Sequence, residues 1–308
     1  MRVTQAGFYN QATQQMGKQQ AKVFETQAQL SSGKKILRPS DDPALASAIN
    51  NLKSQMDINQ RYLTNLERMD DTLKMQEASV SSSIDVVARI KELSVQAAND
   101  TYSASDRKIL AIEVKELISS LADLGNMRGT DGAYLFSGVT QDQAPFLESS
   151  LGVVTYTGTA DYQHVMVDEG RSMQLGIPGS DVYGSVQHKD ATTGEVSSID
   201  FFSTLGNMYQ ALINNDKTAI RDNLDKVGSV HEHIVVQQAN IGSRMKRVET
   251  LTNAIEDRDY TYKTLQSSME DLDYVEAASR LKNQSLALQA GQQTFAQLSG
   301  LSLFKYIR

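Results

Sequence analysis

Apolar residues recur with helical spacing at both ends of this 308-residue chain, and this pattern limits the folds open to it. The stripe near the start consists of Tyr9, Met16, Val23 and Leu30, and the stripe near the end consists of Leu281, Leu288, Phe295 and Leu298. Each stripe is too thin to hold an isolated helix together in water, so each helix needs another helix to cover it. We expect the two stripes to form an assembly interface, in a chain built to assemble and not to enclose a substrate.

Two longer stretches further inside the chain carry the coiled-coil pattern more strongly. In residues 44–98 the series is Ile49, Leu52, Met56, Asn59, Leu63, Leu66, Asp70, Leu73, Glu77, Val80, Ile84 and Val87. The polar members Asn59, Asp70 and Glu77 are expected to favour one register over its neighbours. A second series runs from Leu224 to Tyr262, and because no proline follows Pro178, nothing is expected to break this half sharply.

The middle of the chain differs from both arms. More than half of the 19 glycines lie in residues 128–200, and turn residues there separate short apolar runs. These runs predict strands at Tyr134–Phe136, Val153–Tyr156, His164–Val167 and Met173–Ile177. The predicted fold is therefore mainly α with a small β insert, in which the N- and C-terminal arms form a long antiparallel helical rod.

This pattern also predicts a domain organisation. Residues 44–127 and 200–275 are expected to form the rod of long helices, and residues 128–199 the β-rich insert. Residues 1–43 and 276–308 are expected to be terminal assembly segments, disordered in the monomer and coiled coil in the assembly. Their thin stripes and high glutamine content favour this division.

Composition excludes several classes of function. The chain has no cysteine, so it offers no thiolate nucleophile and no zinc–thiolate site. Its net charge of −7 argues against nucleic acid as a partner. The dispersed lysine and arginine of residues 1–38 favour solvated charge on an assembly helix, or an export segment, over a membrane-binding polybasic arm. No apolar stretch has membrane length and no secretory signal follows Arg2, so an extracellular protein of this sequence is expected to leave by another route.

Candidate chemistry is equally sparse. His231 and His233 are two positions apart on a predicted helix and point to different faces, so they are not expected to share a metal. His164 and His188 lie in the insert without a ligand pattern, and the glycines form no phosphate-binding motif. We expect no catalytic, cofactor-binding or metal-binding residues, no cofactor, and no enzyme.

A short connection separates the first two predicted helices. Ser31-Ser32-Gly33 reads as a helix stop, and Pro39 and Pro43 break any continuous helix. Asp42 is placed to cap the next helix, with Pro43 at its first position and Asp41 adding favourable charge.

This connection carries a resemblance to a known family. Residues 30–48 resemble the N-terminal signature of bacterial flagellins and their relatives, and residues 269–304 resemble the matching C-terminal signature. The residues of the signature loop are Gly33, Arg38, Pro39, Asp41, Asp42 and Pro43. Within the superfamily, the form of this loop, the compact insert and the ending Gly300-Leu301-Ser302-Leu303-Phe304 resemble hook–filament junction proteins more than flagellin itself.

The resemblance implies a structural subunit of the bacterial flagellum, in the layer that joins the hook to the flagellin filament. A filament subunit is the nearest alternative, and a coiled-coil scaffold outside the flagellum is more remote. The implied partners are neighbouring copies in a ring, the other hook–filament junction protein, flagellin and an export chaperone, with no nucleic acid and no membrane insertion. The implied route is the flagellar type III channel, which places the protein outside the cell.

Overall fold

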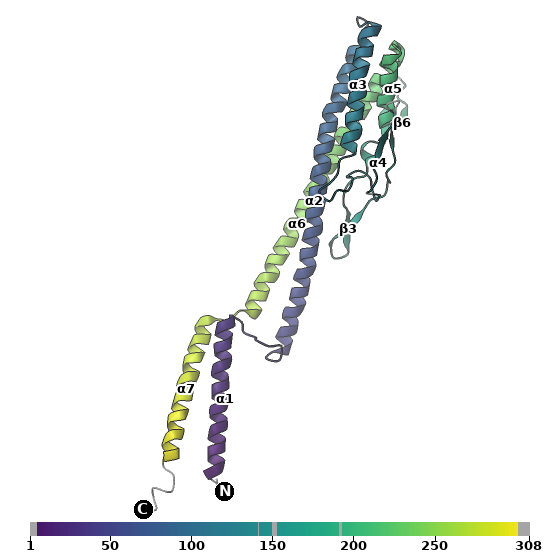
Figure 1. Cartoon of the computed structure of the whole chain (residues 1–308). Coiled ribbons are helices and arrows are strands. Elements are labelled where there is room, and N and C mark those ends of the chain that lie inside the picture. Colours follow the sequence, from purple (N-terminus) through teal and green to yellow (C-terminus); the bar gives the residue numbers. More distant parts are fainter. Residues whose placement is uncertain (1–4, 141, 150–152, 191–192, 301–308) are drawn as a thin grey trace, which may run out of the picture. The chain divides into compact units, whose positions relative to one another are not determined.

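The computed structural model describes residues 5–140, 142–149, 153–190 and 193–300 (Figure 1). The chain forms two compact units. Unit 1 comprises Met1–Ile58 and Asp257–Arg308, and unit 2 comprises Asn59–Glu256. The expected fold class, mainly α with a small β insert, is confirmed.

The two units divide the chain inside its longest helices. The division falls after residue 58 and after residue 256, whereas the sequence pattern places the ends of the assembly segments at residues 43 and 276. The sequence-based division concerns order in the free monomer, and it stays a prediction.

Unit 1 contains four helical segments. They are α1 (Gln5–Ser32), the first part of α2 (Pro43–Ala98), the last part of α6 (Lys217–Glu270) and α7 (Tyr274–Gly300). The predicted cap of α2 is confirmed, since the Asp42 side chain accepts a hydrogen bond from the Leu45 amide at 3.0 Å. Helices α1 and α7 lie side by side (Figure 1).

The C-terminal half is broken in two places, contrary to expectation. Helix α6 ends at Glu270, and α7 begins at Tyr274 after three intervening residues, with the Asp273 carboxylate accepting hydrogen bonds from the amides of Val275 and Glu276. A tighter break at residues 214–216 separates α5 (Phe201–Ile213) from α6, with Asn215 at φ +51°. Both breaks use Asn or Asp in place of proline, because these side chains cap helices and tolerate the left-handed region.

Unit 2 packs parts of α2 and α6 with α3 (Ala104–Gly125) and α5. Helices α2 and α6 run antiparallel, since Glu77 hydrogen-bonds Gln238 and Asp100 pairs with Lys217 and Arg221. The expected capping box of α3 is confirmed: Ser103 and Asp106 exchange hydrogen bonds of 3.2 and 2.9 Å.

A buried arginine ties the ends of these helices together. The Arg107 guanidinium, 1% exposed, donates hydrogen bonds of 2.8 and 2.9 Å to the carbonyl oxygens of Ala97 and Asn99, and one of 2.8 Å to the Asn215 side chain. The carbonyls at the C-terminal end of a helix carry partial negative charge, which favours a cation there. Arg107 thus joins the α2–α3 turn to the α5–α6 turn.

The buried seam of α6 follows the predicted series, and that of α2 follows it only in part. In unit 2 the members of the α6 series are all buried or half-buried: Leu224, Val227, His231, Ile234, Gln238, Ile241, Met245, Val248, Thr252 and Ile255. In α2 the leucine and valine positions of the series are buried except for the half-buried Leu63. Asp70 and Glu77 lie at the edge, while Met69 and Gln76 are fully buried. An α-helix drifts relative to a strict heptad repeat, so the second buried row shifts by one residue.

The β insert consists of three antiparallel hairpins among the described residues, together with the short helix α4 (Gly179–Val182). The strands pair as β1 (Phe146–Glu148) with β2 (Val154–Tyr156), β3 (His164–Asp168) with β4 (Arg171–Gln174), and β5 (Ser185–Lys189) with β6 (Val196–Asp200). The strands predicted at Val153–Tyr156 and His164–Val167 are therefore confirmed to within a residue. The predicted run Met173–Ile177 leaves strand β4 after Gln174.

The strand predicted at Tyr134–Phe136 is wrong. Tyr134 forms only an isolated bridge with Arg128, whose guanidinium lies 4.2 Å from the Tyr134 ring centroid. Phe136 follows in a turn and points into the core, where it is fully buried. The apolar composition of the segment predicted a strand here. The segment instead buries the Phe136 ring in the core, and this burial does not require pairing with a second strand.

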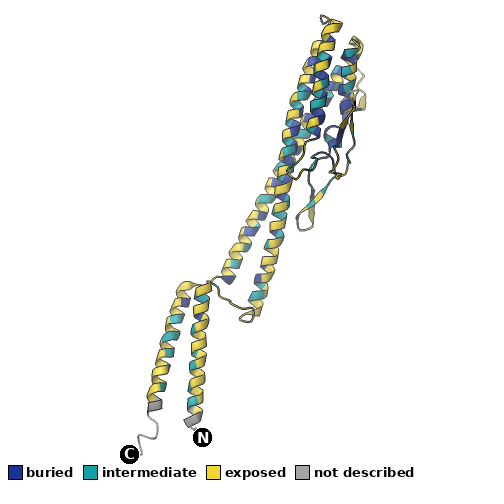
Figure 2. Cartoon of the chain, in the orientation of Figure 1, coloured by how far each residue is buried: buried dark blue, intermediate teal, exposed yellow. Residues whose placement is uncertain are grey.

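Aromatic rings join the insert to the helices of unit 2. The Phe146 ring centroid lies 5.3 Å from that of Tyr183 and 5.4 Å from that of Phe202, and Tyr183 also packs on Phe136 and Phe201. The Tyr183 hydroxyl lies 2.8 Å from the Ser83 hydroxyl of α2. Buried residues therefore concentrate in this part of unit 2, while α1 and α7 are exposed over most of their surface (Figure 2).

Candidate assembly surfaces and cleft

The two terminal stripes meet in unit 1. The rings of Tyr9 and Phe295 pack edge to face with centroids 5.6 Å apart. The other stripe residues with described side chains are half-buried on facing helices: Met16, Val23 and Leu30 on α1, and Leu281 and Leu288 on α7. Leu298 continues α7, but its side chain lies outside the described part of the chain. Within one chain, the structure thus brings the predicted residues together, while their role in an assembly stays a prediction.

Polar and small residues fill the alternate layers of this seam. The Gln19 side chain donates to the Gln284 carbonyl oxygen at 3.2 Å, and the Thr26 hydroxyl donates to the Gln284 side-chain oxygen at 2.9 Å. Gly291 faces Met16, whose Cγ would lie 4.0 Å from a Cβ at that glycine. The sequence prediction missed Gln19, Thr26 and Gln284 because a polar residue in a half-buried row looks like a surface residue when the partner helix is unknown.

The signature loop is hydrogen-bonded to the end of α6, in a contact between residues 33–35 and 270–272 that we call the clasp. Gly33 at φ +73° ends α1, and its carbonyl oxygen accepts a 2.9 Å hydrogen bond from the Leu272 amide. The Lys35 amide donates in return to the Glu270 carbonyl oxygen at 2.8 Å. Gly33 suits this position twice, because its φ lies in the left-handed region and an added Cβ would come within 2.8 Å of the Tyr274 hydroxyl.

Glu270 is the central charged residue of the clasp, and it is 9% exposed. Its carboxylate accepts from Lys34 at 2.5 Å and from Gln266 at 2.8 Å, with Lys53 3.5 Å away. The hydrogen bond from Lys34 is the largest cause that lowers the pKa of Glu270 to about 2 from its usual 4.5, followed by that from Gln266. Glu270 therefore stays ionised at neutral pH and holds the loop to α6.

The remaining loop residues shape the turn into α2. The Asp41 carboxylate accepts from the amides of Leu37 and Arg38 at 3.2 and 2.8 Å, and the adjacent Asp42 caps α2, with Pro43 as its first residue. Arg38 and Pro39 are exposed. The loop is thus organised by its two carboxylates, and Arg38 and Pro39 present their side chains to the outside.

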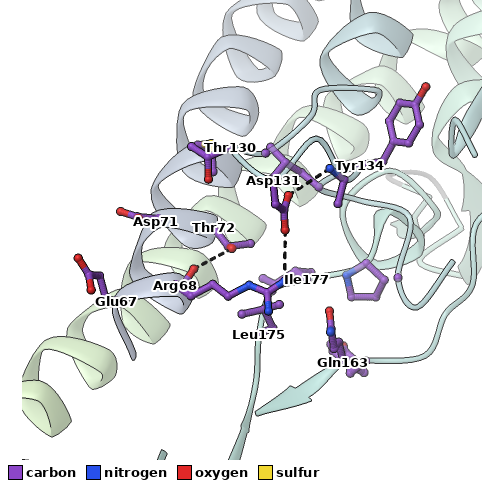
Figure 3. Close-up of a pocket in the computed structure, with 18 of the residues that line it drawn as sticks. Glu67, Arg68, Asp71, Thr72, Thr130, Asp131, Tyr134, Gln163, Leu175 and Ile177 are labelled. Atoms are coloured by element: carbon purple, nitrogen blue, oxygen red, sulfur yellow. Dashed lines mark hydrogen bonds and ion pairs between the residues drawn. The ribbon is translucent and has the colours of Figure 1, made fainter. Parts of the chain in front are cut away.

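A cleft of about 340 Å³ lies in unit 2, between α2 and the insert. Figure 3 shows Arg68 of α2 reaching toward Asp131, with 3.2 Å between their nitrogen and oxygen atoms, and Thr72 bonding the Arg68 carbonyl oxygen. A hydrogen bond from the Ala133 amide is the largest cause that lowers the pKa of Asp131, and Arg68 adds to it. Among the lining residues that the structure describes, none is Cys, His, Lys or Ser.

The back of this cleft is tied to α2 by one side chain. The fully buried Gln76 amide donates to the carbonyl oxygens of Leu135 and Ile177 at 2.7 and 2.8 Å, and accepts from the Ile177 amide at 3.0 Å. An amide side chain provides both the donor and the acceptor that this piece of backbone needs. Gln76 therefore positions the insert on helix α2, a role that its place beside the predicted seam did not reveal.

The histidines serve local structure. His188 lies 2.9 Å from the Ser229 hydroxyl, His233 3.0 Å from the Asp181 carbonyl oxygen, and burial lowers the pKa of His231. Within the described residues, no cluster of three or more His, Cys, Asp or Glu is arranged to hold a metal ion. A search of the same residues finds no helix with the length and apolar character needed to cross a bilayer.

Comparison with known proteins places these features in a family. Residues 3–141 match the bacterial flagellin N-terminal helical region, and residues 224–307 match the bacterial flagellin C-terminal helical region. The chain belongs to the bacterial flagellin family. The resemblance of residues 30–48 and 269–304 to the flagellin signatures is thereby confirmed.

Two curated relatives match over their whole length. The flagellar hook-associated protein 3 of Escherichia coli strain K12 is 27% identical over 321 residues, which cover 99% of each chain. The protein of the same name from Salmonella typhimurium is 27% identical over 324 residues, which cover 100% of each. The predicted similarity to the hook-associated branch of the family is thus confirmed.

Solved structures in the family share the fold. The flagellar hook associated protein-3 of Legionella pneumophila covers 72% of this chain with a TM-score of 0.64 and 17% identity, over 98% of its own length. FlgL of Xanthomonas campestris covers 70% with a TM-score of 0.62 and 20% identity, over 99% of its own length. About 70% of the chain therefore follows a known architecture.

Proposed function

We propose that the chain is a structural subunit of the bacterial flagellum, in the layer that joins the hook to the flagellin filament. The observation that carries this proposal is similarity along the whole length to hook-associated proteins 3 of two bacteria. Flagellin FlaB2 of Treponema pallidum, by contrast, is 33% identical over only 35% of this chain. The match of both ends to flagellin regions keeps a filament subunit as the second candidate.

The α1–α7 pair is the part of the chain that we assign to assembly. Its seam is one apolar residue wide in every second layer, and Phe24 and Leu286 on the outer sides of the two helices are 60% and 55% exposed. A two-helix pair with apolar residues on its outside gains burial when other copies surround it. Residues 1–43 and 276–308 therefore become fully ordered only in the assembled structure.

The proposal extends to partners and location. The partners are neighbouring copies arranged in a ring, the other hook–filament junction protein, flagellin and an export chaperone. The chain reaches the outside of the cell through the flagellar type III channel without a cleaved signal. It works as a building block, without a cofactor and without catalysis.

A deletion strain tests the function. Cells that lack this chain are expected to keep a complete hook and to release flagellin monomers into the medium, because the filament has no layer on which to start. Restoring the chain should restore filaments. Normal filaments in the deletion strain would refute the proposal.

A second experiment separates the two candidate functions. Purified chain is mixed with short filament seeds, and the added length is measured by electron microscopy. A junction subunit adds a limited layer, whereas a filament subunit elongates the seeds extensively. Continued elongation would therefore replace the junction proposal with the filament proposal.

A further inference from the structure

Unit 2 has an open groove between α2 and α6. Residues 60–74 of α2 and 242–256 of α6 form its walls, and it encloses about 800 Å³. Its apolar lining consists of Leu63, Leu66, Met245 and Val248. Two packed helices leave their seam uncovered along such a groove, and a side chain or helix ridge from elsewhere can fill it.

The rim of the groove carries unneutralised negative charge. Of its four carboxylates, Asp70 is paired with Lys74 at 2.6 Å and Glu249 with Lys246 at 2.7 Å. The other two, Glu67 and Glu256, form no ion pair among the described residues. An occupant with an apolar ridge and flanking positive charges therefore fits this groove.

Helix α3 presents such a ridge. Ile109 and Ile112 lie one helical turn apart and are 63% and 62% exposed, among the highest values for large apolar side chains in the described chain. Lys108 and Lys115 flank them on one side, and neither forms an ion pair with the described residues. Glu116 continues the stripe of Ile109 and Ile112, is exposed, and also forms no ion pair with the described residues. The two lysines outnumber it, so the ridge is net positive where the rim of the groove is net negative.

The ridge cannot reach the groove of its own chain. The Arg89–Glu113 ion pair of 2.8 Å places Ile112 opposite the part of α2 near residue 90, whereas the groove is centred near residue 67. At about 1.5 Å per residue, the two sites lie roughly 35 Å apart along one rigid helix. Any contact between them therefore joins two molecules.

We propose that the α3 ridge of one copy packs into the α2–α6 groove of a neighbouring copy. This inference rests on the proposed function, because it takes assembly with other copies as given, and it assigns the surfaces that meet. Ridge and groove are different surfaces, so the contact is heterologous and leaves one of each free to bind the next copy. Neighbours joined in this way are offset along the helix axis by roughly 35 Å, so successive copies form a helical turn of the proposed ring and not a flat, closed one.

Disulfide trapping in the purified full chain tests the contact. The chain has no natural cysteine, so Ile112→Cys combined with Met245→Cys creates one pair that can close only between copies. Mild oxidation should give covalent dimers and longer multimers, which each single variant should lack beyond one collisional dimer. The matched control combines Met245→Cys with Val236→Cys, which is 51% exposed on α6 outside the groove. Equal multimer formation in the control and test pairs would overturn the proposal.

A second measurement covers the case in which Met245→Cys disturbs folding. Asn253→Cys on the exposed rim replaces it without removing a charge, and the same result is expected. Charge exchange provides a further check: Lys108→Glu with Lys115→Glu should abolish the cross-link, and adding Glu67→Lys with Glu256→Lys should restore it. Loss without restoration would contradict the assigned charge pairs.

Photo-crosslinking in isolated flagella identifies the occupant. A photoreactive phenylalanine analogue replaces Ile112, and mass spectrometry locates the attached peptide. We expect residues 60–74 or 242–256 of a second copy. Attachment to another flagellar protein, or to a different surface of this chain, would overturn the inference while leaving the junction function intact. Absence of the chain from flagella would instead refute the proposed function, and the disulfide experiment would still decide the contact.

Discussion

Replacing Glu270 with glutamine should loosen the clasp between the signature loop and the end of α6. The substitution keeps the size of the side chain and removes the negative charge that holds Lys34 at 2.5 Å. Two backbone hydrogen bonds report on the clasp directly. The Lys35 amide donates to the Glu270 carbonyl oxygen at 2.8 Å, and the Leu272 amide donates to the Gly33 carbonyl oxygen at 2.9 Å.

The magnitude follows from the pKa of Glu270, which falls from 4.5 to about 2 in the folded protein. Since each tenfold change in proton affinity is about 1.4 kcal/mol, the ionised carboxylate stabilises the folded clasp by at most roughly 3 kcal/mol. Lys34 is half exposed, and solvent screening reduces this to about 1–2 kcal/mol. The two reporter amides of the variant should therefore exchange about tenfold faster at neutral pH.

The stabilisation by Glu270 should decrease as the pH falls. Because the pKa of Glu270 is lower when folded, its stabilisation is complete above about pH 4.5 and is lost as the pH falls through about 2. The ratio of wild-type to variant protection factors, measured by hydrogen exchange, should approach one at the acid end. Glu276→Gln is the control, because Glu276 is highly exposed and its ion pair with Arg280, at 4.0 Å, is long and therefore weak. A ratio that stays constant across this range, or equal effects of the two variants, would refute the electrostatic argument.

Three further substitutions have defined outcomes. Gln76→Leu leaves the Ile177 backbone groups buried without partners and should lower the free energy of unfolding by about 2–4 kcal/mol in denaturant titration; an unchanged midpoint would contradict its anchoring role. Arg107→Met leaves the carbonyl oxygens of Ala97 and Asn99 and the Asn215 side chain without their donor, and should lower the free energy of unfolding by about 1–3 kcal/mol; a wild-type Tm in calorimetry would contradict this. Phe295→Asp breaks the ring contact with Tyr9 and should abolish incorporation into flagella while the circular dichroism of unit 2 persists; normal motility would refute it.

The sequence revealed the long helices because their apolar residues repeat over many turns. It did not reveal where α6 ends, because the break before α7 depends on Asp273 capping a new helix, and one aspartate among many acidic residues is a weak signal. The short strands β1, β5 and β6 were missed for a related reason. Each pairs within its own hairpin, and its pattern of apolar residues is too short to stand out.

The candidate interface and the two polar anchors outside it differ in how far they could be predicted. Tyr9 and Phe295 could be found by spacing, and the structure places their rings in contact. Gln76 and Glu270 could not, because their importance comes from partners distant in sequence: backbone of the insert for Gln76, and Lys34 for Glu270. A polar side chain becomes a structural anchor only through such partners, and one sequence without its fold does not specify them.

The alternation of apolar and hydrogen-bonding layers between α1 and α7 also determines how these helices come apart. When the hydrogen bonds of Gln19, Thr26 and Gln284 open, their amide and hydroxyl groups bond to water instead of to each other. Most of the free-energy cost of separating the helices therefore falls on the apolar layers. Each apolar layer then presents a barrier on the order of 1–3 kcal/mol. A pull on one end would therefore unzip the pair stepwise under a small, nearly constant force, and the same steps in reverse would close it without a slow cooperative transition.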